Sequence, residues 1–175
     1  MLKKLCLCMC VCVLALLCAC RAEPQWETVD DEAVLEVSAM APKPFIISFG
    51  IPSDAVQQAL EDTASRLYIQ EGGDYEIRSD VISAISLDGA LRQVSGFGET
   101  ELTVLETTRC GLPEYQFAWY STSDEGSFVS RASLVQDGGY YYALVFSVRE
   151  GMGSTYDDCA EAVFASFGLN ADEQF

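Results

Sequence analysis

The chain has 175 residues, half of them hydrophobic, and a formal net charge of −17. A protein this acidic repels nucleic acid and anionic lipid headgroups, so neither is expected as a partner. The sequence contains no histidine. This absence excludes Ser-His-Asp and Cys-His catalysis, together with every zinc site that needs a histidine ligand.

The N-terminus carries a short positive segment followed by an apolar run. Lys3 and Lys4 supply the charge, and the 13 residues of Leu5–Leu17 include no charged side chain. This run has the length of the apolar part of a secretory signal peptide and is short for a membrane span. An uncleaved membrane helix is the alternative interpretation.

The apolar run leads into the sequence "LCAC", which ends at Cys20. These residues resemble the lipobox of bacterial lipoprotein signal peptides. The resemblance implies that residues 1–19 form a cleaved signal peptide and that the Cys20 thiol carries a diacylglyceryl group. Acyl chains on Cys20 would then hold the protein at the cell membrane, facing the extracytoplasmic side.

Four more cysteines alternate with apolar residues inside this leader. Cys-x-Cys repeats can bind a metal through their thiolates, but no polar residue lies between these four to orient such ligands. We therefore interpret them as small hydrophobic residues. They are Cys6, Cys8, Cys10 and Cys12.

Residues 20–44 are acidic and rich in proline. This composition favours a tether, which as a flexible chain would hold the next domain roughly 25–30 Å from the anchor. Ala33–Val37 can add a short strand. Residues 45–175 have the size and the apolar content of a single globular domain.

This domain is predicted to begin with a strand and a helix. The strand starts at Phe45 and ends before Pro52. Ser53 is a candidate N-cap, and apolar residues follow it at helical spacing as far as Leu67. The sequence therefore predicts a helix directly after Ser53.

A hairpin and a second helix are predicted next. Arg66–Gln70 and Tyr75–Ile82 are strand candidates joined by the turn sequence "EGGD". Ser86 is a candidate N-cap for a helix that ends at Gly96.

Strands dominate the following part of the chain. Leu102–Thr108 is predicted to place Val104 and Leu105 inside, and "GLPEY" is predicted to turn the chain. Three further strands joined by short turns predict an antiparallel meander. The last of them is apolar on both faces, so it is predicted to be central and covered on both sides. The three are Tyr115–Ser121, Phe128–Val135 and Tyr140–Val148.

A helix is predicted to close the domain, with Ser154 as its N-cap and Gly168 as its stop. At 100° per residue its apolar side chains fall on one stripe, and Cys159 lies at the border of that stripe. The stripe comprises Tyr156, Ala160, Val163, Phe164 and Phe167.

The aromatic strand "GGYYYALVFSV" and the helix ending "VFASFGL" resemble the corresponding parts of PsbP-like domains. The resemblance covers roughly Tyr75 to Leu169. It implies an α+β fold, in which an antiparallel sheet of about five or six strands has helices packed on its faces. The photosystem member of this family tunes calcium and manganese sites, but no motif of this chain corresponds to that role. The residues that carry the resemblance are Tyr141, Tyr142, Phe146, Phe164, Phe167 and Leu169.

Cys110 and Cys159 are the only thiols left once the leader is removed and Cys20 is acylated. An exported domain meets an oxidising environment, so these two cysteines are predicted to form a disulfide. Such a bridge would close a long loop and contribute about 4 kcal/mol to stability.

No catalytic, cofactor-binding or metal-binding residue is predicted. Acidic clusters could bind calcium, but none has the ligand spacing of an EF-hand, which favours solvated surface charge. The tyrosines of "GGYYYAL" could form a binding stripe, but their period-two spacing favours core positions. The acidic clusters are Asp30-Asp31-Glu32, Asp124-Glu125 and Asp157-Asp158.

These observations predict a lipid-anchored, extracytoplasmic binding or accessory protein of the bacterial cell envelope, without enzymatic activity or cofactor. The expected partners are the membrane, through Cys20, and an envelope protein. The alternative function is a small carboxylate-dependent hydrolase at the envelope. A purely structural envelope protein is a third possibility.

Overall fold

The computed structural model describes residues 45–62, 64–123 and 126–170. The predicted signal peptide, Cys20 and the tether lie outside these residues, as does the strand predicted at Ala33–Val37.

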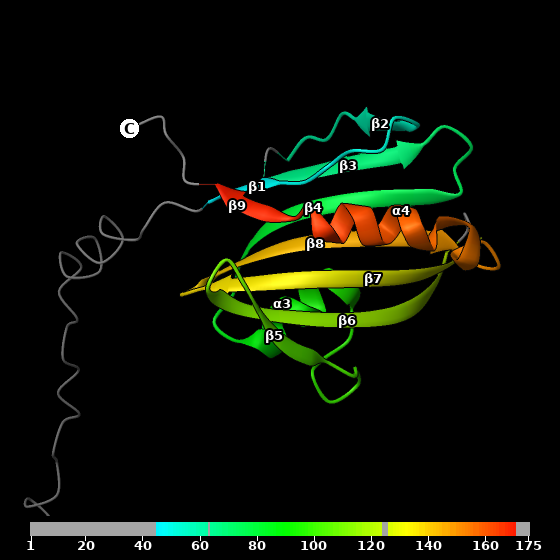
Figure 1. Cartoon of the computed structure of the whole chain (residues 1–175). Coiled ribbons are helices and arrows are strands. Elements are labelled where there is room, and N and C mark those ends of the chain that lie inside the picture. The colour runs from blue at the N-terminus through cyan, green and yellow to red at the C-terminus, as the bar shows by residue number, and fades with distance from the viewer. Residues whose placement is uncertain (1–44, 63, 124–125, 171–175) are drawn as a thin grey trace, which may run out of the picture. The chain divides into compact units, whose positions relative to one another are not determined.

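The described residues form a seven-stranded antiparallel sheet in the order β2-β3-β4-β8-β7-β6-β5 (Figure 1). The predicted antiparallel sheet is confirmed, but it has more strands than the expected five or six. Its strands are β2 (Ala55–Gln58), β3 (Ser65–Gln70), β4 (Tyr75–Ser83), β5 (Leu105–Arg109), β6 (Leu112–Ser123), β7 (Gly126–Asp137) and β8 (Tyr140–Arg149).

Two helices and a small second sheet cover the two faces of the large sheet (Figure 1). One face packs against helix α4 (Gly153–Ala165) and against the strand pair β1 (Ile46–Ser48) and β9 (Gly168–Asn170). The other face packs against helix α3 (Leu87–Ser95). We call them the α4 face and the α3 face.

Strand β8 lies at the centre of the sheet, as predicted, with every residue from Tyr141 to Val148 buried. Its side chains alternate between the two faces because successive residues of a strand point in opposite directions. Tyr142, Leu144 and Phe146 belong to the core under α4, whereas Tyr141 and Ala143 belong to the core under α3. The tyrosines of this strand are thus core residues and do not form a binding stripe.

The prediction of a helix after Ser53 is wrong, because this segment forms strand β2 instead. Val56 pairs with Ile69 across a hairpin between β2 and β3, and both Val56 and Leu60 are exposed. Their apolar spacing therefore does not mark a buried helix face. Pairing with β3 satisfies the backbone of β2, and this tertiary contact overrides the local pattern.

The hairpin between β3 and β4 and helix α3 agree with the predictions. The side-chain oxygen of Gln70 accepts hydrogen bonds from the backbone N–H groups of Gly72 and Asp74 in the turn. Ser86 caps α3 by accepting a hydrogen bond from the N–H of Gly89, and the helix ends at Gly96 in the left-handed conformation.

Strand β5 departs from its prediction, because it starts at Leu105 and leaves the Leu105 side chain 63% exposed. The strand lies at the sheet edge, where it has only one neighbouring strand, β6. Leu102 and Val104 precede the strand and pack against the core under α3. The turn after β5 lies at Cys110 and Gly111, both with positive φ, and "LPEY" already belongs to β6.

Helix α4 buries Ala160 and Val163 as predicted, but its ends differ. It begins at Gly153 after Met152, with no side-chain cap, so Ser154 is not the N-cap. It ends at Ala165, and Gly168 starts β9 rather than stopping the helix.

Candidate functional site

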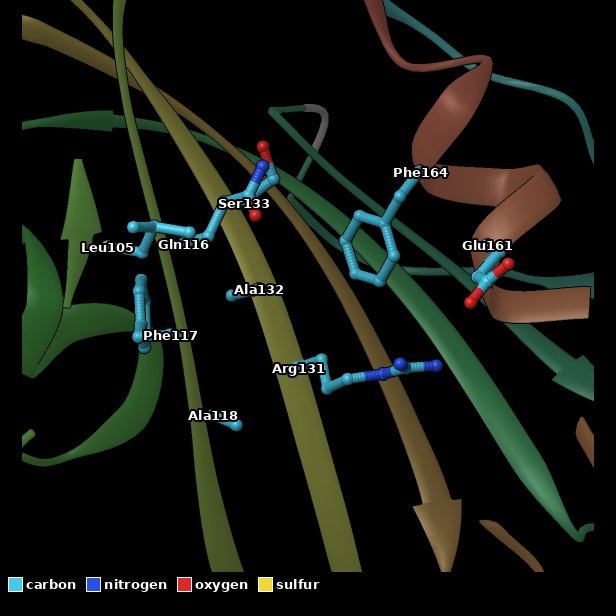
Figure 2. A pocket seen from close by; sticks show the side chains of 9 residues that line it. All are labelled: Leu105, Gln116, Phe117, Ala118, Arg131, Ala132, Ser133, Glu161 and Phe164. Carbon is cyan, nitrogen blue, oxygen red and sulfur yellow. The ribbon is translucent and has the colours of Figure 1, made fainter. Parts of the chain in front are cut away.

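A groove of about 420 Å³ lies on the α4 face, between helix α4 and strands β5, β6 and β7 (Figure 2). Leu105 of β5 and Phe164 of α4 lie on opposite sides of a floor made by β6 and β7. A volume of this size is within the range of protein ligand sites. The lining residues are Leu105, Gln116, Phe117, Ala118, Arg131, Ala132, Ser133, Glu161 and Phe164.

The groove exists because the helix covers only part of the sheet face. Helix α4 contacts the central strand β8 and packs against core residues of β4 and β8. On the neighbouring strands, Gln116 and Ala118 of β6 pair with Ser133 and Arg131 of β7, so these four side chains share the α4 face. Since the Ala118 side chain is small and exposed, the space above it stays open.

One ion pair lies at the margin of the groove. The Arg131 guanidinium is 3.3 Å from the carboxylate of Asp157 on α4, and the two side chains are 41% and 59% exposed. An exposed pair of this kind contributes about 0–1 kcal/mol. Glu161, one turn further along α4, makes no ion pair with any described residue. The margin of the groove is therefore acidic on its α4 side.

A buried charged cluster supports the floor of the groove. The Ser133 hydroxyl donates a hydrogen bond to Glu114 at 2.5 Å, and Arg109 Nε donates to the same oxygen at 2.8 Å. Arg109 also donates to the carbonyl of Phe167 at 3.0 Å. The cluster thus ties the β5–β6 hairpin to the segment that follows α4.

This cluster is unsuited to acid–base chemistry at neutral pH. Burial raises the pKa of the Glu114 carboxyl, but hydrogen bonds from Ser133 and Arg109 outweigh it and hold the pKa below its ordinary value. Glu114 is therefore ionised and cannot act as a general acid near pH 7. A carboxylate of low pKa is also a weak base for the Ser133 hydroxyl. Both groups position the floor of the groove.

A second polar cluster lies near the other end of α4. The Tyr75 hydroxyl donates to Asp54 at 2.6 Å, and Tyr156 of α4 donates to Asp74 at 3.0 Å. Burial and the hydrogen bond to Asp54 raise the pKa of Tyr75 well above its usual range. Burial also raises the pKa of the neighbouring Cys159 thiol, so this thiol is a poor nucleophile.

Cys110 and Cys159 are not joined, and both are free thiols. Cys110 is exposed in the turn between β5 and β6, whereas Cys159 is half-buried beside Tyr75 of β4. In the sheet, β8 and β7 separate β4 from β6. Three strand spacings amount to about 14 Å, while a disulfide needs Cα atoms within about 7 Å. The predicted disulfide is therefore not formed, because the sheet order keeps its partners apart.

We expect alkylation of the denatured, unreduced full chain to modify both thiols. Peptide mass spectrometry should find the alkylating group on Cys110 and on Cys159 without prior reduction. A sample reduced first gives the reference value for complete labelling. A Cys110–Cys159 cross-linked peptide in the unreduced sample would contradict the free-thiol assignment.

Within the described ranges, no three His, Cys, Asp or Glu side chains converge in a way that could hold a metal ion. Asp157 is engaged with Arg131, and Asp124-Glu125 and Asp30-Asp31-Glu32 lie outside the described residues. None of the helices described is long and apolar enough to cross a membrane.

Comparison with known proteins gives a fold but no family assignment by sequence. No family model and no curated protein sequence matches the chain. Cyanobacterial PsbP (CyanoP) from Synechocystis sp. PCC 6803 superposes with a TM-score of 0.50 at 11% identity, over 70% of this chain and 86% of that protein. The chain has a PsbP-like fold. The α+β class implied by the strand and helix sequences is thereby confirmed.

Other solved structures also superpose on this chain, with TM-scores below 0.5. A structure from Bacteroides thetaiotaomicron has a TM-score of 0.49 at 14% identity; the match covers 73% of this chain but only 46% of that protein. LpqN of Mycobacterium tuberculosis, which is involved in cell envelope biogenesis, has a TM-score of 0.42 at 11% identity, over 75% of this chain and 87% of LpqN. At these values the likeness carries no argument about function.

The sequence did not predict the groove beside α4. Its lining residues are distant in the sequence, and no motif connects them. The available signal is weak: Ala118 is a small residue that follows the larger Tyr115, Gln116 and Phe117 in β6. Small residues opposite an amphipathic helix can mark an unfilled space, but they predict no particular ligand.

Proposed function

We propose that this PsbP-like domain belongs to a lipid-anchored binding or accessory protein of the bacterial cell envelope, without catalytic activity. The observation that supports this proposal is the groove beside α4, which is largely apolar and carries a few polar groups. Such a combination is typical of binding sites. No described lining residue is an activated nucleophile, and Glu161 is the one carboxylate among the lining residues.

The hydrolase alternative needs two carboxylates that face the same bond. Asp157 lies near Glu161 on α4, but Arg131 neutralises Asp157. The buried Glu114 is ionised and bonded to Arg109 and Ser133. A binding role therefore fits the site better than hydrolysis does.

The lipid anchor is proposed from the leader and the "LCAC" sequence. We expect Cys20→Ser to abolish attachment, because serine lacks the thiol that forms the thioether bond to the lipid. Cell fractionation should find the wild-type protein with the membranes and the variant as an unprocessed or mislocalised precursor. Mass spectrometry of the wild-type N-terminus should identify a lipid-modified Cys20.

Cys18→Ser is the matched control for this experiment, since it removes a neighbouring thiol and leaves Cys20 in place. Its product should remain lipidated. An unmodified N-terminus at another residue in the wild-type protein would contradict the anchor and the proposed location.

Binding through the groove is tested by photo-crosslinking in intact cells. A photoreactive amino acid at Gln116 is expected to capture a discrete envelope component. The same group at Glu61, between β2 and β3 near the opposite edge of the sheet, is expected not to. Adding Ala118→Trp should fill the groove and reduce the yield at position 116 by about tenfold or more, corresponding to about 1.4 kcal/mol of binding energy. The captured component is then purified and its direct binding measured. Equal adducts from both positions, or no effect of Ala118→Trp, would contradict groove binding.

A further inference from the structure

Strand β5 is the outermost strand of the sheet on the groove side, and β6 is its neighbour in the sheet order. The side chains from Leu105 to Thr108 are exposed. An edge strand presents backbone N–H and C=O groups that can pair with another strand. Natural edges are commonly protected by proline, lysine or a bulge. β5 contains neither proline nor lysine, and its pairing with β6 is regular from Leu105 to Arg109. Its two charged residues are Glu106 and Arg109, of which Arg109 is bonded to the buried Glu114.

The two faces of β5 differ in chemistry. Leu105 pairs with Gln116, so Leu105 points to the α4 face and lines the groove. Glu106 pairs with Tyr115 and points to the opposite face. Glu106 is the cross-strand partner of Tyr115, whose pKa is raised by burial and further by the negative charges of Glu106 and Glu99. On the α4 face, β5 therefore presents the apolar Leu105 beside Thr107 and Arg109, and Arg109 is bonded inward to Glu114. On the opposite face it presents the acidic Glu106 beside Thr108.

The charges around the groove disfavour an anionic ligand such as a fatty acid. Arg131 is the one cationic residue that lines the groove, and Asp157 already neutralises it. Glu161 adds a negative charge on the α4 side. The whole chain is also strongly acidic, at −17, so its long-range field favours cationic partners.

We propose that the groove and the edge of β5 together bind an extended segment of a partner protein in which apolar and basic side chains alternate. The segment adds to β5 as a further antiparallel or parallel strand. Its apolar side chains lie toward Leu105 and the groove, and its basic side chains lie toward Glu106 and Glu99. The inference rests on the proposed binding function and specifies the chemistry of the partner. Addition of a strand to a sheet edge is a recurrent mode of peptide recognition, in which the backbone provides affinity and alternate side chains provide specificity.

The test uses a fluorescent peptide of alternating lysine and valine and the full chain purified in an uncharged detergent. The first control peptide has the same composition but separates lysines and valines into two blocks, and the second replaces lysine by glutamate. We expect the alternating peptide to bind about tenfold or more tightly than either control. Fluorescence anisotropy measures the three affinities.

Two variants of β5, one on each face of the strand, test which side chains contact the peptide, and a third variant outside β5 is the control. Glu106→Lys should weaken binding of the alternating peptide by about fivefold or more, because the attraction between Glu106 and the peptide lysines becomes a repulsion between lysines. Glu61→Lys makes the same change of net charge in the loop before β3, and we expect it to alter the affinity by less than about twofold. Leu105→Ser should also weaken binding, by about threefold, and this effect should not depend on salt concentration.

Amide hydrogen exchange decides whether a strand is added. Bound peptide should slow exchange in residues 105–109 of β5 and leave exchange in β2, at the opposite edge, unchanged. Peptide binding without protection of β5 would overturn strand addition. Slow exchange in β5 before peptide is added, together with a dimer in light scattering, would show that a second copy covers the edge and would also overturn the inference.

Failure of this inference is distinguishable from failure of the proposed function. If crosslinking through Gln116 is specific but no alternating peptide binds, the groove has another ligand and only the inference is overturned. If Gln116 gives no specific adduct and no peptide binds, both the proposed function and the inference are overturned.

Discussion

Replacing Arg109 with alanine is expected to lower the free energy of unfolding by about 3 kcal/mol. The Glu114 side chain is only 3% exposed, and Arg109 is its ion-pair partner at 2.8 Å. Without the guanidinium, a buried carboxylate keeps its charge with only neutral hydrogen-bond donors around it. Chemical denaturation of the full chain measures the loss.

Two further variants separate the effect of the unpaired Glu114 charge from the effect of lost side-chain packing. Arg92→Ala removes an arginine whose side chain is 52% exposed and which pairs with exposed carboxylates, so we expect a loss below about 1 kcal/mol. Adding Glu114→Gln to Arg109→Ala should restore part of the stability, because the uncompensated charge is gone. A double variant less stable than Arg109→Ala would show that charge is not the cause.

The Glu114 carboxylate should also make the free energy of unfolding depend on pH, with stability falling on acidification. The pKa of Glu114 in the folded protein lies below its ordinary value of 4.5. Because the pKa is lower in the folded than in the unfolded chain, ionised Glu114 stabilises the fold at every pH above the ordinary pKa. This stabilisation is lost as the pH falls through the pKa of Glu114 in the folded protein. The stability difference between wild type and Glu114→Gln should therefore be constant near neutral pH and shrink below about pH 4.5. A difference that grows on acidification would contradict this assignment.

Phe146→Ala is expected to cost about 3–5 kcal/mol, because it opens a cavity in the centre of the core under α4. Phe146 is 1% exposed, and its ring stacks on that of Tyr75 with centroids 5.0 Å apart. Phe97→Ala, at a residue 37% exposed, should cost less than about 1 kcal/mol. Thermal and chemical unfolding compare the two variants.

If Phe146→Ala does not fold, Phe146→Leu gives the same information at a smaller loss of about 1–2 kcal/mol. A loss at Phe146 no larger than that at Phe97 would contradict the central position of β8. The groove should keep its binding properties in Phe146→Leu, because Phe146 is not among its lining residues.

Local signals in the sequence were sufficient for several elements. The turn after Gln70 depends on adjacent glycines, and helix α3 depends on its N-cap Ser86 and on Gly96 at its end. The central position of β8 followed from apolar side chains on both faces of one strand. Each of these signals acts within about ten residues, where chain chemistry and backbone conformation are directly linked.

Other features depended on which segments meet in space. Residues after Ser53 carry a helical pattern but form a strand, because β3 offers them a pairing partner. The sequence pattern of its strand predicts that Leu105 points inward, but the side chain is exposed because the strand lies at the sheet edge. Cys110 and Cys159 were paired by elimination, and the strand order keeps them apart.

The sequence by itself determined the acidic charge and the absence of histidine chemistry. Its aromatic strand and closing helix resemble PsbP-like domains, and this resemblance implies an α+β fold. Only the tertiary structure decided where a ligand can bind. The groove arises because α4 packs on β4 and β8 and leaves the small Ala118 side chain of β6 uncovered. The composition and the periodicity of apolar residues constrain which faces of the strands and helices are apolar. The position of a helix across a sheet is set by long-range packing, which no local sequence pattern encodes.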